Sequence, residues 1–545
     1  MENRVRASRK AVFLMFLVLQ LGLVWSFPRY ATQDGPSHLY NAAVISALRS
    51  GSWNGVSTYF RLNPRLVPNW TTYFILIQLM KGFSAANAEK ILVSSYIVLF
   101  ALSFWWVLEL MRPGSEHFLI WGLVLGANWF LSLGFYNFCY GLVFFLLCFG
   151  YWLKWRQSFG ARQYLVLFIL ATLLYITHLF CFLMAALLIG ITGSVASLAD
   201  ARRAEHGSAF RSLAKVLLRS VVIPEMCFMV FLFLNPFSAA GSQYEAHPAT
   251  AQSLTSILWR LTENHGAPIF YPLLDCGGTL AKMIILLLFA FIVAAFYWTL
   301  GRSPERVSAV SYGLAVFSVI CLALYVFGGE SYSGTGMLRE RAGWFGWWSA
   351  FAFLASREWK TRGKLFVSII ATIVFAMGLL SGALWRRQIS PLLAPYSDAA
   401  RMVESGKTML SLCYCSPGAS DFELFKRLRI RPLLHAGEIT ALVGRDFSVA
   451  NYEGTGTSFP VEYLPEVNPA IREPEMMEIG SINADLVDYE EKTGRSIDYV
   501  LVWGGPDVSG QGNRDSRLWT QLRARYTLIY SSPGLLSLRL FRRSV

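Results

Sequence analysis

The sequence predicts a polytopic α-helical membrane protein of about 11 transmembrane helices, followed by a C-terminal α/β or α+β domain outside the membrane. Of its 545 residues, 54% are hydrophobic and only 15% are charged. The mean hydropathy is +0.43, which is too apolar for a soluble protein of this size. From about residue 393 the apolar runs shorten to strand length, which indicates a change of architecture.

The predicted transmembrane segments each approach the length that crosses a bilayer, about 17 to 25 residues. They are 11–27, 86–111, 117–134, 137–153, 163–177, 179–198, 214–234, 279–300, 307–327, 341–356 and 365–385, of which 163–177 and 341–356 are marginal. The stretch 71–80 is too short to cross and is expected to lie along the interface. With this assignment the basic clusters between the segments are cytoplasmic and the C-terminus is outside.

The N-terminal segment favours an uncleaved anchor over a signal peptide. Its apolar run, 11–27, is longer than a usual signal-peptide core, and "SFPRYA" contains no small-x-small cleavage site. Arg4, Arg6, Arg9 and Lys10 keep the N-terminus cytoplasmic. The net charge of +14 comes from short basic groups between apolar segments, a pattern typical of membrane topology and not of nucleic-acid binding.

The chain is expected to form two domains. Residues 1–392 make the transmembrane domain, including a first extracytoplasmic loop at 28–85, and residues 393–545 make an extracytoplasmic soluble domain. In the second domain "DYVLVWGG" and "YTLIYSSPGLLSLRL" favour strands, and "ASDFELFKRLR" and "SRLWTQLRAR" favour helices. Cys413 or Cys415 could pair with Cys276 outside the cell, or both could remain free thiols.

A short helix is predicted directly after the first transmembrane segment. Pro36 suits the first position of a helix that runs to Gly51. Asp34 precedes this helix, and the helix dipole favours its ionised form. His38 follows one turn later. The alternative is that Asp34 only caps the helix and that His38 is an interfacial ring.

Four motifs give the chain a resemblance to a known superfamily. "QDGPSHLYNA" at 33–42, "GFYNFCYGLVFFLL" at 134–147, "THLFCFLMAALL" at 177–188 and "RERAGWFGWW" at 339–348 are similar to landmarks of the GT-C integral-membrane glycosyltransferases, which include protein mannosyltransferases and aminoarabinose transferases. The resemblance implies an enzyme of the bacterial cytoplasmic (inner) membrane. It would transfer a sugar, with inversion, from a polyprenyl-phosphate-linked donor to an acceptor at the extracytoplasmic face.

The resemblance also implies roles for individual residues. Asp34 would be the base or orienting group for the acceptor. Many members have two acidic residues in the first loop, whereas Gln33 and Gly35 flank Asp34 here, so a metal requirement is doubtful and no metal or other cofactor is expected. The expected partners are the lipid-linked sugar donor and membrane lipids.

The departing phosphate needs positive charge beside it, because negative charge grows on it as the sugar leaves. Arg339 and Arg341 are the best candidates at the outer end of 341–356, although interfacial anchoring or an ion pair with Glu340 would also explain them. His178 could bind phosphate or a sugar hydroxyl, or simply pack. Asn137 could likewise bind phosphate or a sugar hydroxyl, or it forms a turn between two transmembrane segments.

Further basic residues give little support for phosphate binding, and the sequence does not favour a metal, nucleotide-binding or serine-hydrolase site. Arg61 and Arg65 could meet phosphate, but anchoring beside Trp70 is the simpler interpretation. The polar residues of the outer loop lack metal-site spacing; they are His247, Glu263, His265 and Asp275. No nucleotide-binding or serine-hydrolase fingerprint is present.

Two other functions stay open. One is a transporter or flippase of lipid-linked glycans, for which Glu109 and Glu225 inside predicted segments would be the relevant groups. The other is a non-catalytic membrane assembly protein whose outer domain binds a partner.

Overall fold

The computed structural model describes residues 2–203, 218–222, 224–226, 228–229, 308–329, 336–414, 430–456, 458–477, 483–504, 517–533 and 537–544. The chain forms two compact units. The first unit contains Met1–Leu23, Val93–Phe130 and Asn137–Gly382. The second unit contains Val24–Leu92, Leu131–Tyr136 and Ala383–Val545. It therefore joins the first loop and the tail, which the sequence analysis assigned to separate domains.

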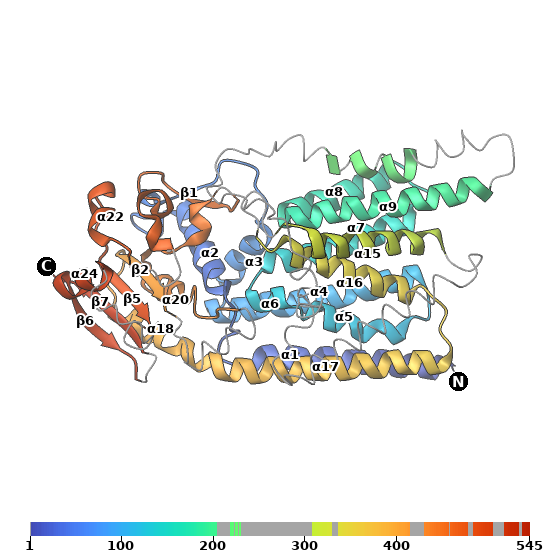
Figure 1. Cartoon of the computed structure of the whole chain (residues 1–545), viewed down its shortest axis with the longest axis horizontal. Coiled ribbons are helices and arrows are strands. Elements are labelled where there is room, and N and C mark those ends of the chain that lie inside the picture. The colour runs from blue at the N-terminus through green and yellow to red at the C-terminus, as the bar shows by residue number, and fades with distance from the viewer. Residues whose placement is uncertain are drawn as a thin grey trace. The chain divides into compact units, whose positions relative to one another are not determined.

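The described part of the chain is mainly helical (Figure 1). The helices are α1 (Glu2–Trp25), α2 (Gly35–Ser50), α3 (Thr71–Leu79), α4 (Ala85–Met111), α5 (Leu119–Gly126), α6 (Trp129–Leu133), α7 (Tyr136–Trp155), α8 (Ala161–Thr177), α9 (Leu179–Arg203), α15 (Ala309–Phe327), α16 (Leu338–Ala355), α17 (Thr361–Ile389), α18 (Ala394–Ala399), α20 (Gly437–Gly444), α21 (Pro469–Arg472), α22 (Leu486–Thr493) and α24 (Arg517–Arg525). The strands are β1 (Phe60–Leu62), β2 (Thr408–Cys413), β3 (Phe447–Ser448), β4 (Val461–Tyr463), β5 (Tyr499–Trp503), β6 (Tyr526–Ser531) and β7 (Leu538–Arg543).

Several helices have the length and composition of membrane spans. Among the described residues there are six: Arg6–Trp25, Ala85–Met111, Tyr136–Trp155, Leu179–Ala199, Ala309–Phe327 and Thr361–Met402. Helix α8 is apolar but shorter. The predicted segment 279–300 and most of 214–234 lie outside the described residues. The protein is a polytopic membrane protein, and the predicted number of about 11 spans stays a prediction.

The predicted single segment 117–134 is wrong, because the chain there is divided between the 3-10 turn Glu116–Phe118, α5 and α6. Asn128 contributes to the break: its side-chain amide donates to the carbonyls of Leu125, at 3.0 Å, and Gly126, at 3.3 Å. These bonds satisfy carbonyl groups at the end of α5 that lack a helical partner.

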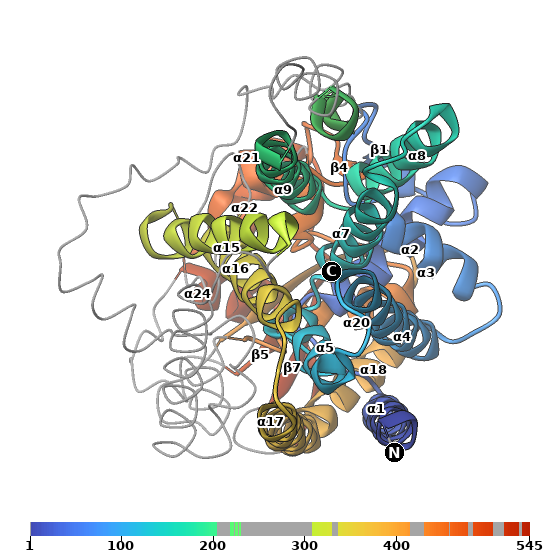
Figure 2. The same cartoon turned by 90° about the vertical axis from the view of Figure 1, so that its right-hand side faces the viewer.

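Helix packing in the first unit depends on aromatic side chains. Helix α15 packs between α9 and α16 (Figure 2). Along α16, Trp344, Phe345 and Trp348 are fully buried. The ring of Phe145 from α7 meets Phe345 and Trp348 edge-on, with ring centroids 4.8 and 5.0 Å apart. Edge-to-face contacts of this kind add to the stabilisation that burial gives.

The tail of the second unit is built on a five-stranded mixed sheet of order β3-β2-β5-β7-β6. Strand β2 is parallel to β3 and β5, and β7 is antiparallel to β5 and β6. The central strand β5, "YVLVW", is buried at every position, as expected for a strand covered on both faces. One face packs on a core that includes residues of α22 and α24, and Tyr396 of α18 stacks on Trp503 of β5.

The predicted tail elements are largely confirmed. The strand in 498–505 is β5, the run 526–540 contains β6 and the start of β7, and "SRLWTQLRAR" contains α24. The predicted helix "ASDFELFKRLR" lies outside the described residues. So do Cys276 and Cys415, so the two alternatives for the cysteines, a disulfide to Cys276 or free thiols, both stay open.

The first loop belongs structurally to the tail. Strand β1 pairs antiparallel with β4, with Arg61 opposite Glu462. Arg61 donates to the Glu462 carboxylate from Nε at 3.1 Å and from Nη2 at 3.0 Å. This arginine is half-exposed, and its binding of phosphate stays a prediction. The Tyr40 hydroxyl of α2 donates to the Asp446 carbonyl at 3.0 Å. These contacts place Asp34 and the helix α2 that follows it against residues 435–463 of the tail.

Candidate functional site

The start of α2 is formed as the sequence predicts, but the Asp34 side chain does not cap it. Pro36 lies at the beginning of the helix, and Gly51 ends it with a left-handed φ of 68°. The Asp34 side chain makes no capping hydrogen bond. Instead the Thr32 hydroxyl accepts from the Gly35 backbone N–H at 3.1 Å. Asp34 thus lies at the N-cap position, and its backbone carbonyl accepts from the His38 N–H at 3.1 Å, but its carboxylate does not cap the helix and is held by other partners.

The segment 131–136 holds Asp34 and His38 from one side. The Asp34 N–H donates to the Leu133 carbonyl at 2.9 Å, and His38 makes a hydrogen bond to the Gly134 backbone. Gly134 has a φ of +83°, and a Cβ there would lie 2.8 Å from the Gly35 nitrogen. Only glycine permits both this conformation and this close approach.

The Asp34 carboxylate is 96% buried and held by named partners. Gln33 Nε2 donates to Oδ1 at 3.1 Å, and the Tyr452 hydroxyl donates to Oδ2 at 3.1 Å. His435 Nε2 lies 3.6 Å from Oδ1. Burial raises the pKa of Asp34 to about 6, while the positive charge of His38 and the bonds from Gln33 and Tyr452 oppose the rise. Burial thus outweighs the helix dipole, although about nine-tenths of the group is still ionised at pH 7.

His38 faces a second carboxylate, Glu453, which the sequence analysis did not identify. His38 Nδ1 lies 3.0 Å from Glu453 Oε1 and 3.0 Å from the Tyr73 hydroxyl. Burial lowers the pKa of His38, but the charge and hydrogen bond of Glu453 raise it more, and the net direction is upward. His38 and Glu453 therefore form a buried ion pair beside Asp34.

Glu453 receives several further donors. Its Oε2 accepts from the Tyr73 hydroxyl and from Asn41 Nδ2, the latter at 2.7 Å. Its Oε1 lies 3.4 Å from the Tyr452 hydroxyl. A buried carboxylate needs such a set of donors to remain charged.

His435 completes the cluster as a neutral ring. Burial and the positive charge of His38 lower the pKa of His435 to about 3. Its ring stacks on Tyr452, with centroids 4.5 Å apart. His435 thus covers Tyr452 without adding charge beside Asp34.

Nothing in the sequence of the tail distinguishes Tyr452, Glu453 or His435 as functional. They reach Asp34 only because β1 pairs with β4 and α2 packs on α20. The second carboxylate that the first loop lacks thus comes from a position 419 residues further along, between Asp34 and Glu453.

A further buried carboxyl, Glu438 of α20, provides a stability prediction. It is 1% exposed and accepts from the Ser448 hydroxyl at 3.3 Å. Burial raises its pKa to about 8 from 4.5. Because the folded pKa lies above the unfolded one, the group destabilises the fold as pH rises through this interval. Glu438→Gln should therefore stabilise the protein by about 3 kcal/mol at pH 7 and by under about 1 kcal/mol at pH 5.

Melting temperatures of purified protein in lipid nanodiscs at the two pH values measure this effect. The exposed Glu404→Gln is a matched control, because Glu404 lies in solvent beside Arg542. An equal stabilisation at pH 5 and pH 7 would contradict the titration of Glu438.

In the first unit the structure brings together two predicted phosphate-binding residues. Arg341, in the first turns of α16, has Nη1 3.4 Å from His178 Nε2. His178 lies between α8 and α9. The Phe138 ring contacts both: the Arg341 guanidinium lies 5.5 Å from its centroid, and the His178 ring meets it edge-on at 5.2 Å. Both polar side chains are more than 90% buried.

Arg339 lies on the helix of Arg341, and Asn137 lies on α7 next to Phe138. Arg339 is 8% exposed and precedes Arg341 by two residues in α16. Asn137 is 4% exposed and is the second residue of α7, directly after the break between α6 and α7, so its binding role and the alternative of a turn both stay predictions. Asp34 and His38 belong to the second unit, whereas the first unit contains Asn137, His178, Arg339 and Arg341. That the two groups act on one substrate stays a prediction.

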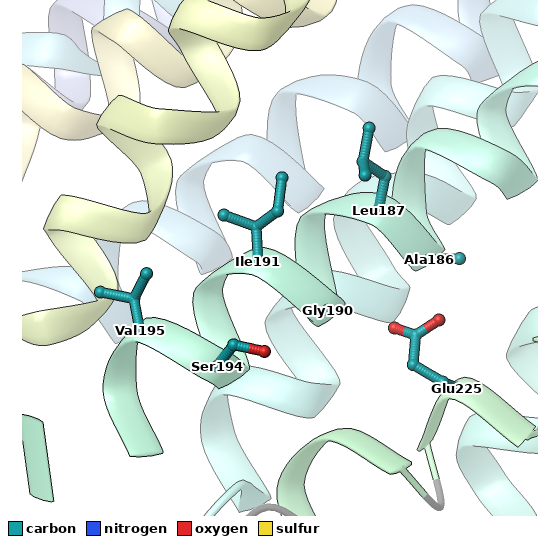
Figure 3. A pocket seen from close by; sticks show the side chains of 7 residues that line it. All are labelled: Ala186, Leu187, Gly190, Ile191, Ser194, Val195 and Glu225. Carbon is teal, nitrogen blue, oxygen red and sulfur yellow. The ribbon is translucent and has the colours of Figure 1, made fainter. Parts of the chain in front are cut away.

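The two acidic residues that are relevant to a transporter are Glu225 and Glu109. Glu225 borders a cavity of about 530 Å³ whose other lining residues are Ala186, Leu187, Gly190, Ile191, Ser194 and Val195 of α9. Figure 3 shows its carboxylate directed toward α9. The lining is apolar apart from Ser194 and Glu225, which does not favour a polar pathway. Glu109 lies 4.0 Å from Lys10 Nζ.

No group of three or more His, Cys, Asp or Glu side chains in the described part of the chain is arranged to hold a metal ion. The residues His247, Glu263, His265 and Asp275 lie outside that part.

Comparison with known proteins gives a similarity of structure but none of sequence. No protein-family model matches the chain, and no curated protein is a significant match. Among solved structures, the chain is similar to the crystal structure of ArnT from Cupriavidus metallidurans bound to undecaprenyl phosphate. The sequence identity is 12% and the TM-score 0.47, and the match covers 98% of this chain and 97% of that chain.

Proposed function

We propose that the protein is an inverting membrane glycosyltransferase that moves a sugar from a polyprenyl-phosphate donor to an acceptor hydroxyl at the extracytoplasmic face of the bacterial cytoplasmic membrane. The observation that carries this proposal is the Asp34 carboxylate. It is buried, held by Gln33 and Tyr452, and has a pKa of about 6. A carboxylate that titrates near neutral pH is a better general base than an ordinary surface aspartate.

The proposed step uses this base directly. Asp34 takes the proton from the acceptor hydroxyl as the acceptor oxygen bonds to the anomeric carbon. The bond between that carbon and the phosphate oxygen breaks on the opposite side, and polyprenyl phosphate leaves with the electron pair. Attack opposite the leaving group inverts the anomeric configuration.

The leaving phosphate gains negative charge, and a buried guanidinium stabilises such charge strongly. Arg341 is proposed for this role, with Arg339 as a second cation. His178, 3.4 Å from Arg341, is proposed to hold the guanidinium in place and to bond the phosphate or a sugar hydroxyl. Asn137 is proposed as a further polar contact to the sugar.

A transfer assay tests the proposal. Purified protein in nanodiscs receives polyprenyl phosphates carrying radiolabelled glucose, galactose, mannose or an amino sugar, with a cell-envelope extract as the acceptor source. Label should move from the lipid to the acceptor, with release of polyprenyl phosphate. If the donors only cross the bilayer intact, the protein is a flippase, and if they are neither cleaved nor moved, the assembly role is favoured.

The rate of transfer should depend on pH through Asp34. Only the ionised form can accept a proton, so activity should fall as pH decreases, with a midpoint of about 6 set by the pKa of Asp34. The measurement is kcat/KM for the donor between about pH 4.5 and 8, with melting temperature recorded at each pH as a control. A rate that rises as pH falls would contradict a basic role for Asp34.

A further inference from the structure

The tail domain contributes the hydroxyl that lies between the two carboxylates of the site. The Tyr452 hydroxyl is 3.1 Å from Asp34 Oδ2 and 3.4 Å from Glu453 Oε1. A phenol has one proton to donate. Which carboxylate receives that proton decides how Asp34 titrates.

Glu453 is already supplied with donors from other elements. Tyr73 and Asn41 donate to Oε2, and His38 Nδ1 lies 3.0 Å from Oε1. Among the residues that the structure describes, Asp34 has one other donor within hydrogen-bond distance, Gln33 Nε2. The Tyr452 proton is therefore directed to Asp34, which is also the nearer acceptor.

We propose that Tyr452 is a positioning residue, supplied by the tail, that keeps the buried Asp34 in its carboxylate form and so ready to act as a base. The proposal deepens the proposed function and rests on it for its role in transfer, but its effect on Asp34 exists without substrate. The tail domain then serves as part of the reaction site, and not only as a cover or a docking domain.

The other charged and titratable groups around Asp34 are compatible with this role. They are His38 of α2, Tyr73 of α3, Glu89 of α4, His435 just before α20, Glu438 in α20, and Glu453; the Glu89 carboxylate lies against Gly35, the residue after Asp34. His38 is the cation among them and favours the ionised form of Asp34. The negative charges of Glu453 and of a partly ionised Glu438 disfavour that form, and His435 is neutral. Tyr452, by contrast, donates a hydrogen bond to Asp34 Oδ2, at 3.1 Å.

The test measures the protonation of Asp34 without any substrate. Infrared difference spectra of the purified protein in nanodiscs, recorded as a function of pH, contain the C=O band of the protonated carboxyl, which is assigned by its absence in Asp34→Asn. In Tyr452→Phe the midpoint of this band should move to higher pH by about one unit, since a hydrogen bond to a carboxylate is lost. Tyr526→Phe is the matched control, because it removes a hydroxyl of the same domain that bonds to the Ile497 carbonyl.

A second substitution should shift the midpoint in the opposite direction, and it changes the structure less because the hydroxyl is kept. Placing 3-fluorotyrosine at position 452 makes the hydroxyl a stronger donor, so the midpoint should move to lower pH. An unchanged midpoint in both variants, or an upward shift with 3-fluorotyrosine, overturns the proposal. If both shifts occur but the transfer assay fails, the role of Tyr452 stands and the proposed function does not.

Discussion

Asp34→Asn should reduce sugar transfer by about 10²- to 10⁴-fold, because an amide of the same shape cannot accept the acceptor proton. The amide oxygen can still accept from Gln33, which donates to Oδ1 at 3.1 Å. Donor binding should therefore change little, and the loss should appear in kcat. The measurement is the rate of polyprenyl phosphate release at saturating donor, compared with the wild type.

The same variant should not be less stable, and this separates a catalytic role from a structural one. Burial raises the pKa of Asp34 from 3.8 to about 6, so the ionised group destabilises the folded protein once pH exceeds the unfolded value. Removing the charge should stabilise the protein by up to about 3 kcal/mol near pH 7.5 and by under about 1 kcal/mol at pH 4. Asp398→Asn, at a half-exposed position paired with Arg401, is the control for both measurements. A strong loss of stability in Asp34→Asn would mean that Asp34 supports the fold.

Arg341→Gln should lower kcat/KM for the lipid donor by about 10²- to 10³-fold, because a buried cation that meets a developing negative charge acts on the transition state. Arg341→Lys should recover only part of the loss, since a lysine cannot present two N–H groups in one plane to phosphate. Initial rates over a range of donor concentrations measure both effects.

The control for Arg341 must account for its packing. The guanidinium lies over Phe138 at 5.5 Å, so its removal also takes away contacts. Arg357→Gln removes a similar stacking on Phe353, at 5.8 Å, from the end of α16. Equal losses of activity in the two variants, or near-normal transfer by Arg341→Gln at an unchanged melting temperature, would contradict a phosphate-binding role.

Much of the local structure can be predicted from the sequence because it depends on nearby residues. Pro36 and Gly51 mark the two ends of α2, and the apolar run at 499–503 forms the central strand of the tail. The ionisation of Asp34 at neutral pH was also predicted, although through the helix dipole. The dominant effect, burial by partners from the tail, has no local sequence signal.

The second carboxylate could not be predicted for the same reason. Glu453 reaches His38 through the pairing of β1 with β4, which joins short strands about 400 residues apart. Three-residue strands have little pattern of their own, and such long-range pairing is set by tertiary packing. The division of 117–134 was missed because Asn128 acts together with distant helices there: the carbonyls at the end of α5 also accept from Tyr96 and Trp344.

The most direct test of the basic role of Asp34 is chemical rescue. Azide is a nucleophile that carries no proton to be removed, so Asp34→Ala should form glycosyl azide from the polyprenyl-phosphate donor while its transfer to a hydroxyl acceptor stays strongly reduced. The account predicts this recovery only in the variant that lacks the base. Transfer to the hydroxyl acceptor by Asp34→Ala at the wild-type rate, or the absence of any azide product from a folded variant that still binds donor, would contradict it.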